Sequence, residues 1–240
     1  MHDLSREELS GLLGILAGNV LVHYGMWFSE TVRRVGLDNA VQLEQEAFQK
    51  YGPLAMTRLG PTIGAHPSLA FTDQIAQKKQ EDLREILDNL AKTWVISDGC
   101  WFQAVEAVHG MTVAKEINDQ CWFNFAAIEA FKILSFCGLE KGCGLQGLQQ
   151  SLEFRTYSII NSHSSHIELD GSLLFVMEEC RVQSSRRRKN LADYPCKSAG
   201  MIEYSQFATC IDPGITTECL YCPPDPMEKD QFCGWLFKID

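Results

Sequence analysis

The cysteines near the end of the chain constrain its fold more than any other sequence feature. Six of the ten cysteines lie between residues 180 and 233. Cys219 and Cys222 form a C-x-x-C pair, with Cys196 upstream of the pair and Cys233 downstream. A C-x-x-C turn lets two thiolates point at one ion, and two distant cysteines complete a tetrahedron. The spacing therefore predicts a metal site formed by Cys196, Cys219, Cys222 and Cys233.

Two other interpretations of these cysteines stay open. They are either reduced core cysteines without a special role, or a redox or catalytic thiol pair. Four thiolates suit tetrahedral zinc, but they also suit a 4Fe-4S cluster. Cys180 is a ligand in reserve, because it follows two acidic residues inside a predicted strand. A closed zinc site of four thiolates would hold the fold without doing chemistry.

Length and charge narrow the class of protein. The chain of 240 residues contains no apolar run of the roughly 18 to 20 residues that a membrane span needs. Its first residues lack the basic-then-apolar order of a signal peptide, so we expect a cytoplasmic protein that does not bind membranes. A net charge of −10 argues against nucleic-acid partners. The basic run at residues 186–189 is interpreted as a solvated turn after a strand.

The first part of the chain has helical periodicity. Ser5-x-x-Glu8 is a capping box, and apolar residues then recur at spacings of three and four until Gly36. Further helices are expected over about residues 39–51 and on the apolar face formed by Leu83, Ile86, Leu87, Leu90 and Trp94. Ser97-Asp98-Gly99 is predicted to restart the chain, with a short helix up to Gly110 and a long one over about 112–136.

From about residue 153 the pattern changes to that of strands. Residues 154–160 are rich in β-branched and aromatic side chains, and Asp170-Gly171 lies between two apolar runs as in a hairpin. A helix over 196–210 and strands over 215–220 and 232–239 complete the chain. The sequence thus predicts an α+β protein, with a helical bundle in residues 1–144 and a mostly antiparallel sheet with helices in residues 145–240.

Two groups of side chains are candidates for binding or chemistry. His23, Trp27 and Glu30 share one side of the first helix, and with Trp101 and Trp122 they are candidates to line a pocket for an aromatic or heterocyclic ligand. The alternative is an amphipathic helix with a few boundary aromatic residues.

The second group is Asp98, Cys100, Glu106 and His109, which lie within about three helical turns. A carboxylate, a thiol and an imidazole can support general acid–base or nucleophilic catalysis, although Asp98 also fits the role of a helix cap. No phosphate-binding loop, H-E-x-x-H or G-x-S-x-G motif occurs, which argues against nucleotide hydrolysis and a standard serine hydrolase.

The C-terminal part resembles a known domain type. Cys196, Cys219, Cys222 and a last cysteine directly before Gly234-Trp235-Leu236-Phe237 follow the cysteine order of 4-vinyl-reductase-type domains, over roughly residues 145–240. The resemblance implies the zinc site and the binding of a small molecule. Residues 223–232 depart from the pattern by lengthening the last loop.

The whole chain is similar to an uncharacterised prokaryotic family of cytosolic proteins. The similarity rests on the segments at 97–102, Ser-Asp-Gly-Cys-Trp-Phe, and at 222–225, Cys-Pro-Pro-Asp. That family is distantly similar to L-2-amino-thiazoline-4-carboxylate hydrolase-like proteins.

These observations lead to one main expectation and two alternatives. We expect a cytosolic metal-containing protein that binds a small apolar or aromatic molecule between its helical half and its α+β half. The alternatives are a hydrolase of a small cyclic amide or thiazoline, and an iron–sulfur redox protein. The sequence does not decide whether the protein is an enzyme, and it leaves a homodimer open.

Overall fold

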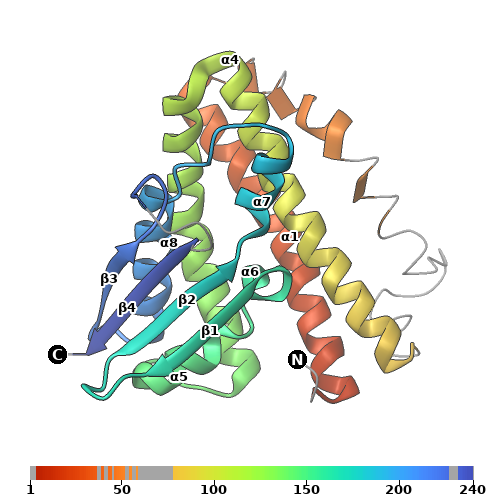
Figure 1. The fold of residues 1–240 in the computed structure, drawn as a ribbon. Helices are drawn as coiled ribbons and strands as arrows, with labels where there is room; N and C mark the ends of the chain where they lie inside the picture. Colours follow the sequence, from red (N-terminus) through yellow and green to blue (C-terminus); the bar gives the residue numbers. More distant parts are fainter. Residues whose placement is uncertain are drawn as a thin grey trace. The chain divides into compact units, whose positions relative to one another are not determined.

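The computed structural model describes residues 4–36, 39–40, 43–44, 46–51, 54–55, 58, 78–226 and 232–239. The chain forms two compact units, Met1–Cys121 and Trp122–Asp240 (Figure 1). The first is helical and the second combines helices with a sheet, so the α+β class is confirmed. The predicted domain boundary at residue 144 and the predicted ligand site between the halves stay predictions.

The helical unit begins with α1, Arg6–Val35, whose ends follow the sequence signals. The Ser5 hydroxyl accepts a hydrogen bond from the Glu8 backbone N–H, and the Glu8 carboxylate accepts one from the Ser5 N–H, at 3.3 and 2.7 Å. Gly36 ends the helix with a φ of 83°, a conformation that suits glycine. The predicted inner face is confirmed by the complete burial of Leu9, Leu12, Leu13 and Leu16.

The second long helix, α4, spans Gln80–Cys137 and therefore enters both units. The predicted apolar face is buried here too, at Leu83, Ile86, Leu87, Leu90 and Trp94. Gly110 interrupts the helix with a φ of 81° and a ψ of 170°, where a break was predicted. The predicted restart at Ser97-Asp98-Gly99 is wrong, because these residues continue the helix without a break.

One helix bears on the question of membranes. Among the described residues, only α1 has the length and hydropathy of a membrane-spanning helix. A core helix of a soluble protein has the same properties, and α1 carries buried polar side chains at Asn19, His23 and Thr31. These features are consistent with a soluble protein.

The second unit contains a four-stranded antiparallel sheet with the order β1-β2-β4-β3. The strands are β1, Ser162–Ile167; β2, Leu173–Glu179; β3, Ile215–Tyr221; and β4, Cys233–Ile239. β1 and β2 form the hairpin that Asp170-Gly171 predicted, and β3 and β4 lie close to their predicted positions. The helices are α5, Gly144–Leu152; α6, Thr156–Ile160; α7, Arg181–Arg188; and α8, Lys197–Ile211.

The core of this unit lies between the sheet and α8. Trp235 and Phe237 of β4 are completely buried, and the Trp235 ring stacks on Tyr204 of α8 with centroids 4.7 Å apart. The indole also lies so close to Gly200 that a Cβ there would come within 2.6 Å of it. The predicted helix over 196–210 is therefore confirmed, and glycine allows it to approach the sheet closely.

Three local predictions in this unit are wrong. Residues 154–160 do not form a strand: Thr156–Ile160 form α6, and the Glu129 carboxylate accepts a hydrogen bond from the Thr156 N–H at 2.8 Å and caps the first turn. Cys180 follows β2 and precedes α7, so it does not lie inside a strand. Residues 186–188 of the basic run belong to α7 instead of a turn, and Arg186 is 9% exposed.

Candidate functional site

The predicted metal ligands all lie at one end of the sheet in the second unit. Because neighbouring strands are antiparallel, the ends of β2 and β3 lie beside the start of β4 (Figure 1). The cysteines occupy these positions and the start of α8: Cys180 directly after β2, Cys196 as the residue before α8, Cys219 and Cys222 in and after β3, and Cys233 as the first residue of β4.

A β-bulge brings the C-x-x-C pair onto one face of the sheet. Side chains alternate along a regular strand, so residues three apart would face opposite sides. Here Cys219 pairs with Trp235 but Tyr221 pairs with Gly234, which leaves Leu220 as an extra residue. The next position in this register sets Cys222 opposite Cys233. Cys219 and Cys222 therefore share the face that is covered by α8.

Burial and neighbouring thiols together raise the pKa values of several cysteines in this cluster. Hydrogen bonds with the Cys196 and Cys233 thiols, followed by burial, raise the pKa of Cys222 far above its usual value. Burial raises the pKa of Cys219 to about 11, with a contribution from Cys233. Burial also raises the pKa of Cys180 to about 12, and the charges of Cys196 and Cys233 add to it. The Cys180, Cys219 and Cys222 thiols are thus protonated at neutral pH.

In this form the thiols are not arranged around a common centre. Within the described ranges, no three His, Cys, Asp or Glu side chains are grouped as a metal ion requires. Residues 227–231 of the lengthened loop lie outside those ranges.

Neighbouring polar groups fix the segments that carry Cys196 and Cys222. The Gln183 amide donates to the Cys196 sulfur at 3.1 Å and to the Tyr194 carbonyl at 2.7 Å. Asp225 closes the turn after β3, because its carboxylate accepts from the Cys222 N–H at 3.3 Å and its N–H donates to the Cys222 carbonyl at 2.9 Å. Lys197 at the start of α8 binds the same carboxylate at 2.8 Å. These contacts tie the start of α8 to the end of β3.

The helical unit holds a second polar cluster, centred on Asp98. The Trp27 indole N–H donates to Asp98 Oδ1 at 2.9 Å, the Asn118 amide donates to the same oxygen at 3.1 Å, and His23 Nε2 lies 3.5 Å from it. Asp98 and Asn118 both belong to α4, on either side of the break at Gly110. The break therefore allows one helix to supply both the carboxylate and the amide that binds it. Asp98 is an internal helical residue with tertiary partners and does not have the predicted role of a helix cap.

Burial controls the ionisation of this cluster. It raises the pKa of Asp98 to about 6, against hydrogen bonds from Trp27 and Asn118 and the positive charge of Lys115. Burial also lowers the pKa of His23 to about 3, so the imidazole is neutral. At neutral pH the cluster therefore contains a carboxylate among neutral donors.

Aromatic rings surround this cluster. Trp101 stacks on Trp27 with centroids 6.2 Å apart, and Tyr24 meets its edge at 5.5 Å. His23 stacks on Trp94 at 5.2 Å. Three of the four predicted ligand-binding residues, His23, Trp27 and Trp101, thus lie together. Trp122 belongs to the other unit, where it packs edge-on against Phe125 and Tyr157.

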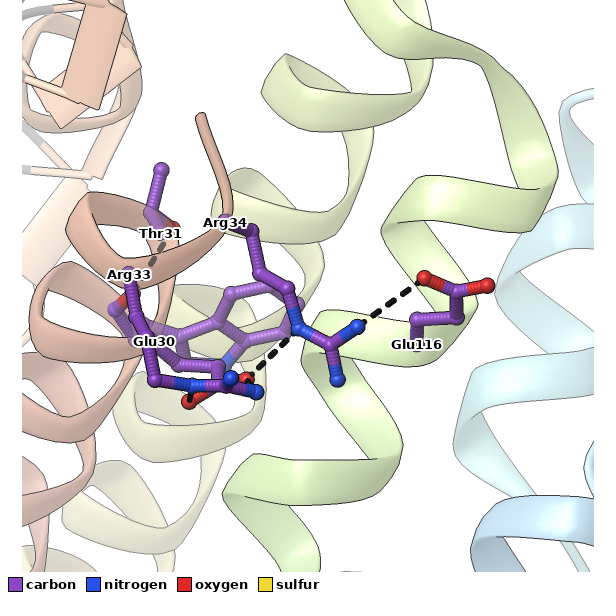
Figure 2. Close-up of polar contacts among 6 residues, drawn as sticks. Glu30, Thr31, Arg33, Arg34 and Glu116 are labelled. Carbon is purple, nitrogen blue, oxygen red and sulfur yellow. Dashed lines mark hydrogen bonds and ion pairs between the residues drawn. The ribbon is translucent and has the colours of Figure 1, made fainter. Parts of the chain in front are cut away.

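Glu30 belongs to a separate ion-pair network at the end of α1. Figure 2 shows its carboxylate between Arg33 and Arg34, and Arg34 reaches on to Glu116 at 3.1 Å. Burial opposes ionisation of Glu30, but the hydrogen bonds from both arginines outweigh it and lower its pKa.

The predicted catalytic residues do not form one site. Asp98 and His109 are eleven residues apart on an unbroken helical stretch, which separates them by about 16 Å. Burial raises the pKa of Tyr51 to about 12, and the charge of Cys100 contributes to this rise. Cys100 likewise contributes to the raised pKa of Tyr24. Glu106 and His109 are half-buried near the break at Gly110.

Three contributors were missed from the sequence: Asn118, Gln183 and the closing role of Asp225. Asn118 is 1% exposed and lies on the same buried stripe as Ala114, Ile117 and Cys121. A polar residue on an otherwise apolar helical face was the signal that could have identified it. Gln183 gives no such signal, because its partners, Tyr194 and Cys196, lie beyond the turn that follows α7 and their positions cannot be read from helical spacing.

Comparison with known proteins gives a family for the chain. No curated protein and no solved structure matches it. The family of unknown function DUF6125 matches residues 2–70 and 76–239. Because the match extends over nearly the whole sequence, the protein belongs to the family of unknown function DUF6125.

Proposed function

We propose that this is a cytosolic zinc-containing protein that binds a small aromatic molecule. Zinc would be held by Cys196, Cys219, Cys222 and Cys233. The observation that carries the proposal is that the Cys196, Cys219 and Cys233 thiols lie close enough to Cys222 to act on one another's protonation, although they come from three separate places in the sequence.

The chemistry of the donor set supports zinc. Thiolates are preferred zinc ligands, and a bound zinc ion takes the place of the protons on buried thiols. Cys180 lies in the same cluster and could replace one of the four. A closed site of this kind supplies stability and no reaction, and it would join the end of β3 and the start of β4 to α8.

The binding part of the proposal rests on the helical unit. Its cluster of Trp27, Trp101 and His23 around a partly exposed carboxylate has the mixture of aromatic surface and few polar groups that is typical of small-molecule sites. The resemblance of residues 145–240 to 4-vinyl-reductase-type domains implies both zinc and a small ligand, and we include it in the proposal. The distant similarity to thiazoline hydrolase-like proteins adds no catalytic residues to it.

Elemental analysis of the purified protein, together with its ultraviolet–visible spectrum, tests the metal. We expect about one zinc per chain and no visible absorbance, and Cys222→Ser should lose the zinc. Cys210→Ser is the matched control, because Cys210 lies in α8, where its sulfur has a 3.9 Å contact from Gln206, and it is not one of the proposed ligands. Cys180→Ser should keep the metal if Cys180 is the spare thiol.

Three results would contradict the proposal. A brown protein with broad visible absorbance and bound iron would show that the site holds an iron–sulfur cluster instead of zinc. Protein without any metal, or zinc that Cys222→Ser retains in full, would remove the site itself.

A further inference from the structure

Three polar side chains form a buried stripe on α4 within the helical unit. Thr93, Ser97 and Trp101 are four residues apart, so they follow one another along one side of the helix. They are 1%, 1% and 0% exposed. Within the described part of the chain, Thr93 Oγ1, Ser97 Oγ and Trp101 Nε1 have no hydrogen-bond partner.

Buried polar atoms without partners are unusual in a folded protein. Each loses its hydrogen bonds to water, which costs about 1–3 kcal/mol, so the large majority of such atoms are paired. Three on consecutive turns form a place where another molecule can supply the missing partners. Trp101 is the most informative of them, because an indole N–H can only donate and therefore requires an acceptor.

Asp98 lies next to this stripe and has an oxygen that remains accessible. The described contacts with Trp27, Asn118 and His23 are all made by Oδ1, and the side chain is 18% exposed. The second oxygen, Oδ2, is thus the acceptor that can meet a donor from outside the protein.

The surrounding charges also favour a donor at Asp98. Lys115 pairs with Asp119 at 2.8 Å, while Arg33 and Arg34 bind Glu30 and Glu116. These three cations are therefore paired with other carboxylates. His23 is neutral, so the charge of Asp98 is met by neutral hydrogen bonds from Trp27 and Asn118 and by the nearby charge of Lys115, which is shared with Asp119.

We infer that the helical unit binds a small planar molecule that presents an N–H donor to Asp98 Oδ2 and a neighbouring acceptor to Trp101 Nε1. This inference rests on the proposed function and names the chemical class of its ligand. The Trp101 ring is stacked on Trp27 and flanked by Tyr24 edge-on and by Phe28 at a tilt, and such an aromatic setting favours a planar ligand over a branched aliphatic one. A cyclic N–H next to a ring carbonyl or ring nitrogen meets these requirements.

Calorimetric titration of the full-length protein with 2-pyridone tests the inference. This probe has an N–H beside a carbonyl, and N-methyl-2-pyridone keeps the ring and the acceptor but lacks the donor. We expect 2-pyridone to bind at least about ten-fold more tightly than its N-methyl form, since a hydrogen bond to a charged group is lost. Asp98→Asn and Trp101→Phe should each weaken 2-pyridone binding by a similar factor.

Asp88→Asn is the matched control, because Asp88 is a more exposed carboxylate on the same helix that pairs with Lys92. It should leave binding unchanged. Zinc content and circular dichroism check that each variant is folded, and Asp98→Asn tests the site if Trp101→Phe does not fold.

Equal affinity for 2-pyridone and its N-methyl form would overturn this inference while leaving small-molecule binding intact. Binding that is insensitive to both Asp98→Asn and Trp101→Phe would do the same. No binding up to about 10 mM, above the millimolar dissociation constants typical of such small ligands, would overturn it as well. The zinc measurements remain independent of all three results.

Discussion

The Arg155 guanidinium donates a hydrogen bond to Glu129 at 2.9 Å, and the two side chains are only 2% and 1% exposed. Arg155 also contacts Glu203 of α8 at 2.7 Å and lies over the Phe207 ring at 4.5 Å. One cation in the core of the second unit thus joins α4 to α8. Its two carboxylate partners hold the pKa of Arg155 above its usual value despite burial.

Removal of this cation should destabilise the second unit strongly. Arg155→Met leaves Glu129 and Glu203 buried without a compensating charge, and we expect a loss of about 3–5 kcal/mol in the free energy of unfolding. Urea unfolding followed by circular dichroism measures it. Arg187→Met removes a surface pair with Asp193, both about 41% exposed, and should cost no more than about 1 kcal/mol. Similar losses in the two variants would contradict this account of the buried ion pair.

The contact between Gly200 and Trp235 predicts an unusual response to alanine. Alanine normally stabilises a helix relative to glycine by about 1 kcal/mol. At position 200 the added Cβ would lie 2.6 Å from the completely buried indole, so Gly200→Ala should instead destabilise by about 1–3 kcal/mol. Gly25→Ala on the exposed side of α1 meets no atom within 4 Å and should be neutral or stabilising. Thermal unfolding of the two variants compares them, and a stabilised Gly200→Ala would show that the helix can move away from the sheet.

Asp98 and His23 should give stability opposite dependences on pH. The pKa of Asp98 rises from 3.8 to about 6 on folding, so its contribution is present below pH 4 and is lost as the pH rises through 6. The pKa of His23 falls from 6.5 to about 3, so its contribution is present above pH 6.5 and is lost as the pH falls through 3.

Asp98→Asn removes the first of these contributions. Acidification from pH 7 to pH 4.5 should therefore lower the stability of this variant by about 2 kcal/mol more than that of the wild type. Urea unfolding at the two pH values gives the difference. The same pH dependence in both proteins would show that Asp98 titrates normally in the folded state.

Much of the fold follows from local sequence signals. The capping box at Ser5 and the glycine at position 36 bound α1 because they satisfy the free backbone groups of a helix within a few residues. Asp170-Gly171 similarly produces the hairpin of β1 and β2. The spacing of the cysteines also identified Cys196, Cys219, Cys222 and Cys233 before their positions in space were known, although their role as ligands stays a prediction.

Other features depend on partners that are distant in the sequence. Residues 154–160 have the composition of a strand, yet Thr156–Ile160 are helical and Glu129 on α4 binds the Thr156 N–H at the start of this helix. Ser97-Asp98-Gly99 has the composition of a break, but Trp27 and Asn118 bind the Asp98 carboxylate from outside its own turn, so that carboxylate does not act as a cap.

The cysteine tail shows the same division. Its sequence alone determined which thiols are candidates, because a C-x-x-C pair and two further cysteines are visible without any structure. Only the tertiary structure decided that they meet, through an antiparallel register and the extra residue Leu220, which turns Cys222 to the same face as Cys219. Spacing along a chain can be read from the sequence, whereas the face to which a side chain points depends on the strands with which it pairs.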